Sequence, residues 1–232
     1  MENTETTTAS SKSNGCMWPV DADATLQTML DSEACVPLLR QTLTGALTWH
    51  VRNRRPLRRA LASPGIAPQW MAALLALGAS VTVEREPEPE QIPLETLLHE
   101  RIEGEIIALH VRTEGIRWGY AQVARTPVDD PIVAAVACVE MQGDQVHDAR
   151  IALTGAWSRP VGLATAPGRL TGGPLDEEQI QAVAMAVEEE VSPKGDFRGS
   201  AEYRRAMARV MTRRALEQCL QDRLQDSLQE EV

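Results

Sequence analysis

The chain has 232 residues, of which 43% are hydrophobic, and its formal net charge is −10. A chain of this size can bury a substantial core in one or two domains, whereas its negative charge disfavours general binding to nucleic acid or to an anionic membrane. Aromatic residues make up only 3%, which leaves little material for surfaces that stack on bases.

The cysteines and the amino-terminal segment indicate the compartment. Four scattered cysteines without a CxxC pair are typical neither of a disulfide framework nor of a zinc or iron–sulfur site. Residues 1–20 are largely polar and lack the apolar segment of a signal peptide. No apolar run approaches the roughly 20 residues of a membrane helix. We therefore expect a disordered lead-in over residues 1–20 and a cytoplasmic protein that does not bind membranes.

In the first half of the chain, the apolar spacing predicts mainly helices. Residues 21–43 indicate two short helices with a break near Glu33–Cys35. Residues 68–78 are apolar nearly all round, with a proline at the start and a glycine at the end, which predicts a buried helix. Residues 79–84 indicate a strand, and residues 85–93, "REPEPEQIP", a stiff and solvated connector.

The second half predicts a different unit. Residues 104–113 and 116–125 are strand-like, and two apolar runs on either side of the sequence "QGDQ" (142–145) predict a β-hairpin. Residues 175–191 indicate an amphipathic helix, and a long terminal helix with Ser200 as its cap follows. The expected fold class is α+β, with a three-stranded antiparallel sheet packed with helices in this unit.

A run of positive charge separates the first helices from the buried helix. Five arginines stand within the eight positions from Arg52 to Arg59. The residues alone leave three interpretations open, which are a phosphate-binding loop, a surface that docks a partner, and an ordinary solvated turn.

The sequence contains no pattern of a catalytic or metal site. GxSxG, HExxH, P-loop and GxGxxG motifs are absent, and the four histidines stand far apart. The acidic runs at residues 84–90 and 187–190 are typical of solvated surface. We therefore predict no catalytic residues and no metal ligands.

Three segments near the carboxyl end carry a family resemblance. Residues 148–161 (DARIALTGAWSRPV), 172–180 (GGPLDEEQI) and 197–218 (FRGSAEYRRAMARVMTRRALEQ) resemble the C-terminal domain of the FAD-binding medium subunit of molybdenum hydroxylases, the carbon monoxide dehydrogenase and xanthine dehydrogenase relatives. That domain ends in a helix with the pattern RGSAEYR…VLxRRAL.

Earlier segments extend the resemblance over about residues 22–220. Residues 119–141 resemble the family's segment YxKxxRxxxDxAxVxxA, and residues 24–43 and 74–84 are similar to its second FAD-binding subdomain. After the lead-in at 1–20, the resemblance implies a partial FAD-binding subdomain at 21–112 and the C-terminal domain at 113–227.

The resemblance also assigns the arginine run. The family sequence RNxGTIGGN aligns without a gap, so that TIGGN falls on residues 56–60 of this chain. Glycines there let backbone N–H groups approach the FAD pyrophosphate, whereas this chain has Arg58 and Arg59, and Pro56 lacks an N–H group. The implied cofactor-binding positions are Arg58, Arg59, Ala60 and Tyr120. We expect Tyr120, which matches a family tyrosine near the isoalloxazine ring, to be structural and to lie at a strand end.

The resemblance leads to a functional hypothesis. Family members begin with a subdomain that carries an AGGxS-type turn, and residues 1–20 contain no such motif, so we expect an N-terminally truncated member. FAD is possible by resemblance, but the altered loop argues against it. A patch that faces solvent or a partner is the favoured role of the arginines, and another phosphate-bearing ligand is the remaining alternative.

The implied partners are a large molybdopterin-binding subunit and a small subunit with [2Fe–2S] clusters. We expect a degenerate, non-redox subunit with a structural or assembly role. The alternative is a working FAD-binding electron-transfer subunit of a molybdopterin-dependent dehydrogenase, and a third interpretation is a stand-alone binding module.

Overall fold

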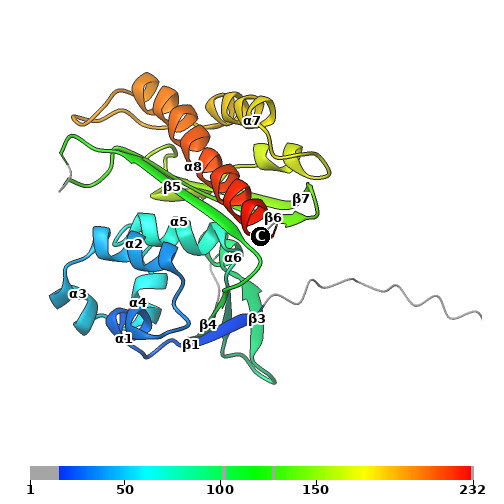
Figure 1. The fold of residues 1–232 in the computed structure, drawn as a ribbon. Coiled ribbons are helices and arrows are strands. Elements are labelled where there is room, and N and C mark those ends of the chain that lie inside the picture. Colours follow the sequence, from blue (N-terminus) through cyan, green and yellow to red (C-terminus); the bar gives the residue numbers. More distant parts are fainter. Residues whose placement is uncertain (1–15, 101–102, 127–128, 231–232) are drawn as a thin grey trace, which may run out of the picture.

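The computed structural model describes residues 16–100, 103–126 and 129–230, with side chains as far as residue 221. Figure 1 shows two stacked units, each with its own sheet. The first unit contains β1 (Met17–Asp21), α1 (Leu26–Asp31), α2 (Pro37–Ala46), α3 (Trp49–Arg54), α4 (Leu57–Leu61), α5 (Pro68–Ala76), β2 (Ser80–Val83), β3 (Glu90–Pro93), α6 (Leu94–His99) and β4 (Ile106–Arg112). The second contains β5 (Arg117–Val123), β6 (Val133–Gln142), β7 (Gln145–Thr154), β8 (Val161–Leu163), the 3₁₀ helix η1 (Ala166–Leu170), α7 (Glu177–Glu190) and α8 (Ala201–Glu230).

The first sheet has the strand order β1-β4-β2-β3 and is antiparallel throughout. Residues 17–20 were expected to belong to a disordered lead-in, and this was wrong, because they form the edge strand β1. Val20 pairs with Leu109 of β4, a partner far along the chain that no local pattern reveals. Pro19 is compatible with this strand because an edge strand has one side free of ladder hydrogen bonds.

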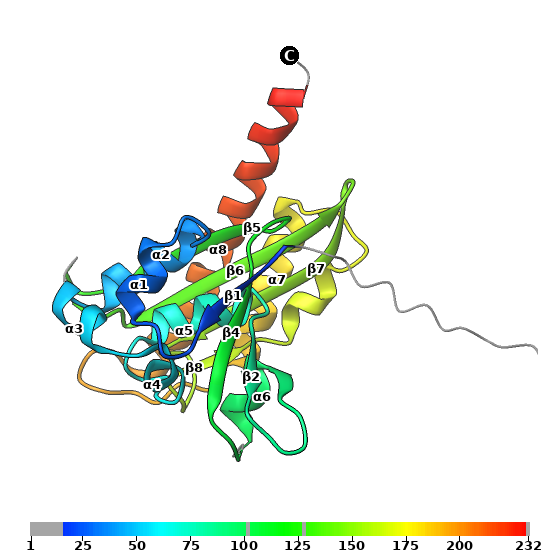
Figure 2. The same ribbon diagram turned by 90° about the horizontal axis from the view of Figure 1, so that it is seen from below.

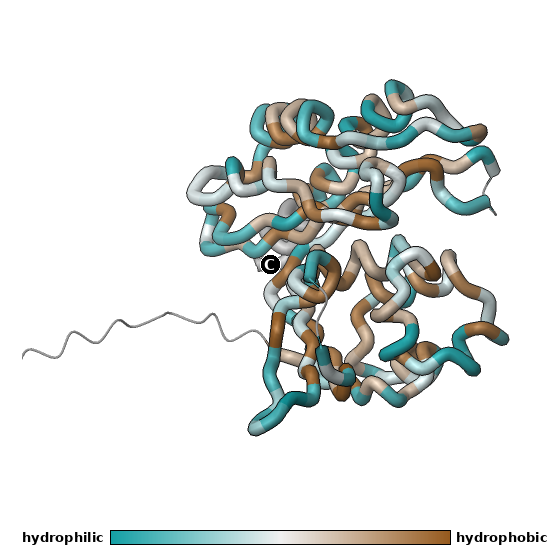
Figure 3. The backbone as a smooth tube through the Cα atoms, turned by 180° about the vertical axis from the view of Figure 1, so that it is seen from behind, coloured by the Kyte–Doolittle hydropathy of each residue, from teal (hydrophilic) through white to brown (hydrophobic). Residues whose placement is uncertain are grey.

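The predicted connector at residues 85–93 is also partly a strand. Its last four residues form β3, where Ile92 is buried and pairs with Val81 of β2. The preceding residues remain exposed, as predicted, and form the hydrophilic tip at the foot of the molecule in Figure 3. The alternation of Ile92 with polar neighbours was too short to indicate a strand by itself.

The second sheet has four strands in the order β5-β6-β7-β8, one more than predicted. The added strand, β8, has three residues, and Gly162 pairs with Leu153 of β7. A strand this short leaves no periodic pattern in the sequence. The predicted hairpin is confirmed, since β6 and β7 are joined through Gly143, whose φ of 60° suits a tight turn.

The second sheet is buried on both faces, which explains the continuous apolar run of β6. Val136 and Cys138 pack into the same core as the apolar helix α5, whereas Ala135 and Val139 pack with α7 and α8. The predicted burial of α5 is confirmed, because Trp70 is fully buried there. Figure 1 shows the helices of the first unit below this sheet and α7 and α8 above it, and Figure 2 shows the same arrangement from below.

The long terminal helix begins as predicted, since the Ser200 hydroxyl accepts a hydrogen bond from the Tyr203 N–H at 3.2 Å. It lies directly on β5, where a Cβ on Gly119 would be 1.9 Å from the Ala215 carbonyl oxygen. Glycine is therefore needed at position 119 for this approach. None of the helices in the described ranges has the length and apolar character that crossing a membrane requires.

Candidate functional site

The arginine segment folds as helix rather than loop. α3 ends at Arg54 and α4 begins at Leu57, and Pro56 is the N-cap residue of α4. The junction is held by an antiparallel bridge between Pro56 and Thr25 and by a 3.1 Å hydrogen bond from the Leu26 N–H to the Arg55 carbonyl. Residues 55 and 56 are therefore fixed against the start of α1.

The backbone donors of this segment are all used within the chain. The N–H of Leu57 donates to the Ala24 carbonyl and that of Arg58 to the Ala22 carbonyl, both at 2.9 Å. The N–H groups of Arg59 and Ala60 both donate to the Pro56 carbonyl, at 3.1 and 3.4 Å. Pro56 itself has no N–H group. Residues 56–60 thus present no free amide donor to a ligand.

The Arg58 side chain is held by two carboxylates of the same chain. One guanidinium nitrogen lies 3.0 Å from a carboxylate oxygen of Asp23, in the turn after β1, and another pairs closely with Glu105, just before β4. Neither acid stood out in the sequence, because each is an isolated residue far from position 58. Arg58 therefore joins three parts of the first unit.

Arg52 is also structural. It is one of the few buried charged residues, donates from Nε to the Gln27 side-chain oxygen at 2.9 Å, and bonds to the Leu47 carbonyl. The five arginines do not form one patch, since Arg52 and Arg58 are bonded within the chain. The other three, Arg54, Arg55 and Arg59, line a cavity of about 300 Å³ together with His50, Val51 and Pro56.

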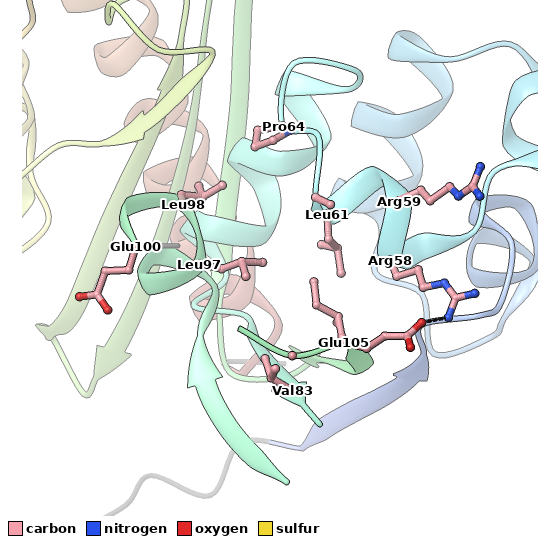
Figure 4. Close-up of a pocket in the computed structure, with 12 residues that line it drawn as sticks. Arg58, Arg59, Leu61, Pro64, Val83, Leu97, Leu98, Glu100 and Glu105 are labelled. Carbon is pink, nitrogen blue, oxygen red and sulfur yellow. Dashed lines mark hydrogen bonds and ion pairs between the residues drawn. The ribbon is translucent and has the colours of Figure 1, made fainter. Parts of the chain in front are cut away.

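A larger cavity of about 540 Å³ lies on the other side of α4, between α4, α6 and the ends of β2 and β4. Its apolar lining includes Leu61, Val83, Leu97, Leu98 and Ile106, and its charged lining consists of Arg58, Arg59, Glu100 and Glu105. Figure 4 shows Leu61 and Leu97 directed toward its centre and the Arg59 guanidinium directed away from these leucines.

Tyr120 lies elsewhere, in the middle of β5 rather than at a strand end as expected. It lines neither of these two cavities. Its hydroxyl donates to the Gln122 side-chain oxygen, and Gln218 of α8 bonds both the N–H and the carbonyl of its backbone, at 2.8 and 3.2 Å. Burial raises the pKa of the Tyr120 hydroxyl far above its usual value, so the group is neutral under ordinary conditions.

The segment around RGSAEYR positions a buried arginine. Arg204 is 6% exposed and donates to the carbonyls of Ile132 and Gly155, at 2.6 and 3.2 Å. It also pairs with Asp196 at 2.7 Å, and this bond is the main reason that the pKa of Asp196 lies below its usual value. Arg204 thus ties α8 to the chain on either side of the β6–β7 hairpin, a role that the motif alone did not reveal.

Comparisons with known proteins find relatives of this chain. A model of the CO dehydrogenase flavoprotein C-terminal domain matches residues 118–219, which include β6 to β8, α7 and most of β5 and α8. The medium chain of carbon monoxide dehydrogenase from Hydrogenophaga pseudoflava is 27% identical over 184 residues, 76% of this chain and 64% of that protein. The nicotine 6-hydroxylase medium subunit from Paenarthrobacter nicotinovorans is 28% identical over 165 residues, 68% of this chain and 58% of that protein.

These matches support the family of FAD-binding medium subunits of molybdenum hydroxylases for this chain, and the family model covers its C-terminal unit. It spans 58% and 64% of the length of the two curated relatives. The fold is shared with carbon monoxide dehydrogenase from Hydrogenophaga pseudoflava (TM-score 0.76, 24% identity, 89% of this chain and 76% of that one). It is also shared with quinoline 2-oxidoreductase from Pseudomonas putida 86 (TM-score 0.75, 23% identity, 89% and 75%).

FAD is the cofactor that this family implies, and residues 56–60 do not fit its pyrophosphate. A diphosphate at this loop needs free N–H groups and room for close approach. Here the four N–H groups are bonded within the chain, and Arg58 and Arg59 stand where the family glycines are expected. The described residues also contain no group of three or more His, Cys, Asp or Glu side chains that could hold a metal ion.

Proposed function

We propose that this chain is a degenerate medium subunit that does not carry out redox chemistry and that serves a molybdenum hydroxylase complex as a structural or assembly subunit. The observation that supports this most strongly is the state of residues 57–60, whose N–H groups all donate within the chain. Arg58, in addition, is held by Asp23 and Glu105. An incoming pyrophosphate would have to break these bonds before it could form its own.

The proposed partners are a large molybdopterin-binding subunit and a small [2Fe–2S] subunit. Their support comes from the relatives, which are named as medium subunits or, in one case, as a subunit of a 6-hydroxypseudooxynicotine dehydrogenase complex. The C-terminal unit, which the family model matches, keeps its close helix–strand packing and the Arg204 network. A cytoplasmic location stays part of the proposal, and scattered cysteines without a CxxC pair are compatible with a reducing compartment.

The alternative is a working FAD-binding electron-transfer subunit. The cavity of about 540 Å³ beside α4 favours it, because this volume and the apolar lining are typical of pockets for cofactors and other small molecules. In this case a ring system would occupy the cavity between Leu61 and Leu97, and the diphosphate would need donors other than the amides of residues 57–60.

The experiment is to isolate the tagged full-length chain from its native host and to determine molybdenum, iron and flavin per chain. Molybdenum and iron without flavin are the expected result. About one flavin per chain would replace the proposal with the alternative. A chain that purifies without metals or flavin would indicate a stand-alone binding module and would overturn the proposed complex.

A further inference from the structure

The cavity between α3 and α4 gathers three arginines in a chain whose net charge is negative. The chain has 33 acidic side chains against 23 Lys and Arg, so carboxylates are available to pair with its arginines. Arg58, Arg85 and Arg112, for example, each pair with one or two acids. Arg54, Arg55 and Arg59 have no ion pair with any acid in the described ranges, although they share one cavity.

The lining of this cavity contains no carboxylate. Its residues are His50, Val51, Arg54, Arg55, Pro56 and Arg59, and its volume is about 300 Å³. Three guanidinium groups around one small cavity repel one another unless an anion lies between them. A net negative ligand would therefore gain from all three at once.

Arg55 supplies a second observation. Its Nε is buried and has no hydrogen-bond partner within the described protein. Burying a donor without a partner costs free energy, so such groups in folded proteins normally bond to something. A ligand oxygen in the cavity that Arg55 lines would satisfy this group once the side chain turns to expose it.

The backbone around Arg55 is fixed before any ligand arrives. Its N–H donates to the Val51 carbonyl and its own carbonyl accepts from the Leu26 N–H, both at 3.1 Å, and the next residue forms the bridge to Thr25. A site that is already ordered binds with a smaller entropy cost than a flexible loop.

From these observations we infer that Arg54, Arg55 and Arg59 form a binding site for a phosphate or diphosphate group of a small molecule. Guanidinium is the cation best matched to phosphate, because its planar N–H groups can bond two oxygens at once. The donors are side chains on α3, α4 and their junction, not the backbone amides of residues 57–60. This inference is therefore independent of whether the chain retains FAD.

The test is isothermal titration of the full-length chain with inorganic pyrophosphate, with orthophosphate and ADP as separate titrants. We expect saturable binding of one pyrophosphate per chain. Arg54→Gln and Arg55→Gln should each weaken it about ten-fold, because each removes a charge-assisted hydrogen bond. Arg54 is exposed, so its replacement leaves the fold intact.

Arg169→Gln is the matched control, since Arg169 is an exposed arginine of the second unit, and it should leave the affinity unchanged. ADP that binds as tightly as pyrophosphate would identify a nucleotide as one source of the phosphate, whereas a strong preference for pyrophosphate or orthophosphate would favour a non-nucleotide source. The inference fails if none of the three titrants saturates the chain. It also fails if Arg169→Gln weakens binding as much as Arg54→Gln does.

Tighter binding of a polyglutamate peptide than of pyrophosphate would identify the cavity as a docking surface for an acidic protein and would overturn the inference of a small-molecule site.

Discussion

Arg58 and Glu105 form an ion pair that ties helix α4 to the residue that precedes β4, and Asp23 closes on the same guanidinium. Both carboxylates come from outside the arginine segment. Arg58, which the family alignment assigned to the flavin loop, therefore connects separate parts of the first unit. The side chains are partly exposed, at 38% for Arg58 and 57% for Glu105.

The first prediction concerns this link. Arg58→Gln should lower the free energy of unfolding by only about 1 kcal/mol, because ion pairs in contact with solvent contribute little. Urea denaturation checks this value, with Arg169→Gln as a control that removes an exposed arginine without such a pair in the part of the chain that the structure describes. A loss of several kcal/mol would contradict the view that the pair is screened by solvent.

The second prediction concerns restoration of the family glycines. Arg58→Gly with Arg59→Gly should not give tight FAD binding, because Pro56 still lacks an N–H group and the N–H of Leu57 still donates to Ala24. Fluorescence titration of FAD measures the outcome. Micromolar affinity in the double variant would show that the two arginine side chains alone had excluded the flavin.

The third prediction concerns the contact between α8 and β5. Gly119→Ala should destabilise the protein by about 3 kcal/mol, since the new Cβ would overlap the Ala215 carbonyl oxygen, a backbone atom that cannot move aside cheaply. Gly45→Ala is the control, because nothing lies within 4 Å of a Cβ there and α2 should gain about 1 kcal/mol of helix propensity. Denaturant midpoints that shift equally for the two variants would refute the close approach.

The fourth prediction concerns Arg204. Arg204→Gln should lower the free energy of unfolding by about 3 kcal/mol, because it removes the buried donor of the Ile132 carbonyl and the charged partner of Asp196. Arg213→Gln, which breaks an exposed pair with Glu217, should cost less than about 0.5 kcal/mol. Similar losses for both would mean that the Arg204 network contributes no more than a surface ion pair.

The fifth prediction is a pH dependence. The pKa of Asp196 lies below its usual value in the folded protein, mainly because Arg204 bonds to its charged form. Its contribution to stability is therefore complete above its unfolded pKa, near 4, and is lost as the pH falls through the lower folded value. The stability difference between the wild type and Asp196→Asn should be constant from pH 5 to 7 and should shrink below pH 4, as followed by urea denaturation. A difference that stays the same at pH 3 would contradict the assignment.

The sequence predicted those helices and strands that are marked by their own periodicity and by residues at their ends. α5, α7, α8 and the β6–β7 hairpin have helical or strand periods and clear ends such as Pro68, Gly143 and Ser200, and the structure contains each of them. β1 and β8 were missed because they are short and because a partner elsewhere in the chain decides their pairing. α3 and α4 were missed because a charged run without an apolar stripe is typical of a loop.

The candidate site could be predicted only in part. The resemblance to the family identified residues 56–60 as the altered segment, but it did not predict the burial or the bonding partners of each arginine. Arg52 is buried, Arg58 is paired, and Arg54 lines a cavity, three outcomes for one residue type within seven positions. Each outcome depends on residues such as Gln27 and Glu105, which tertiary folding brings close and no sequence pattern marks.

We propose that this chain does not bind flavin, and the most direct test is a visible spectrum of the purified full-length chain followed by titration with FAD. We expect a colourless protein that shows no saturable binding at low micromolar FAD. A yellow protein with a flavin absorption band, or saturation at low micromolar FAD, would contradict the claim and would assign the chain to electron transfer.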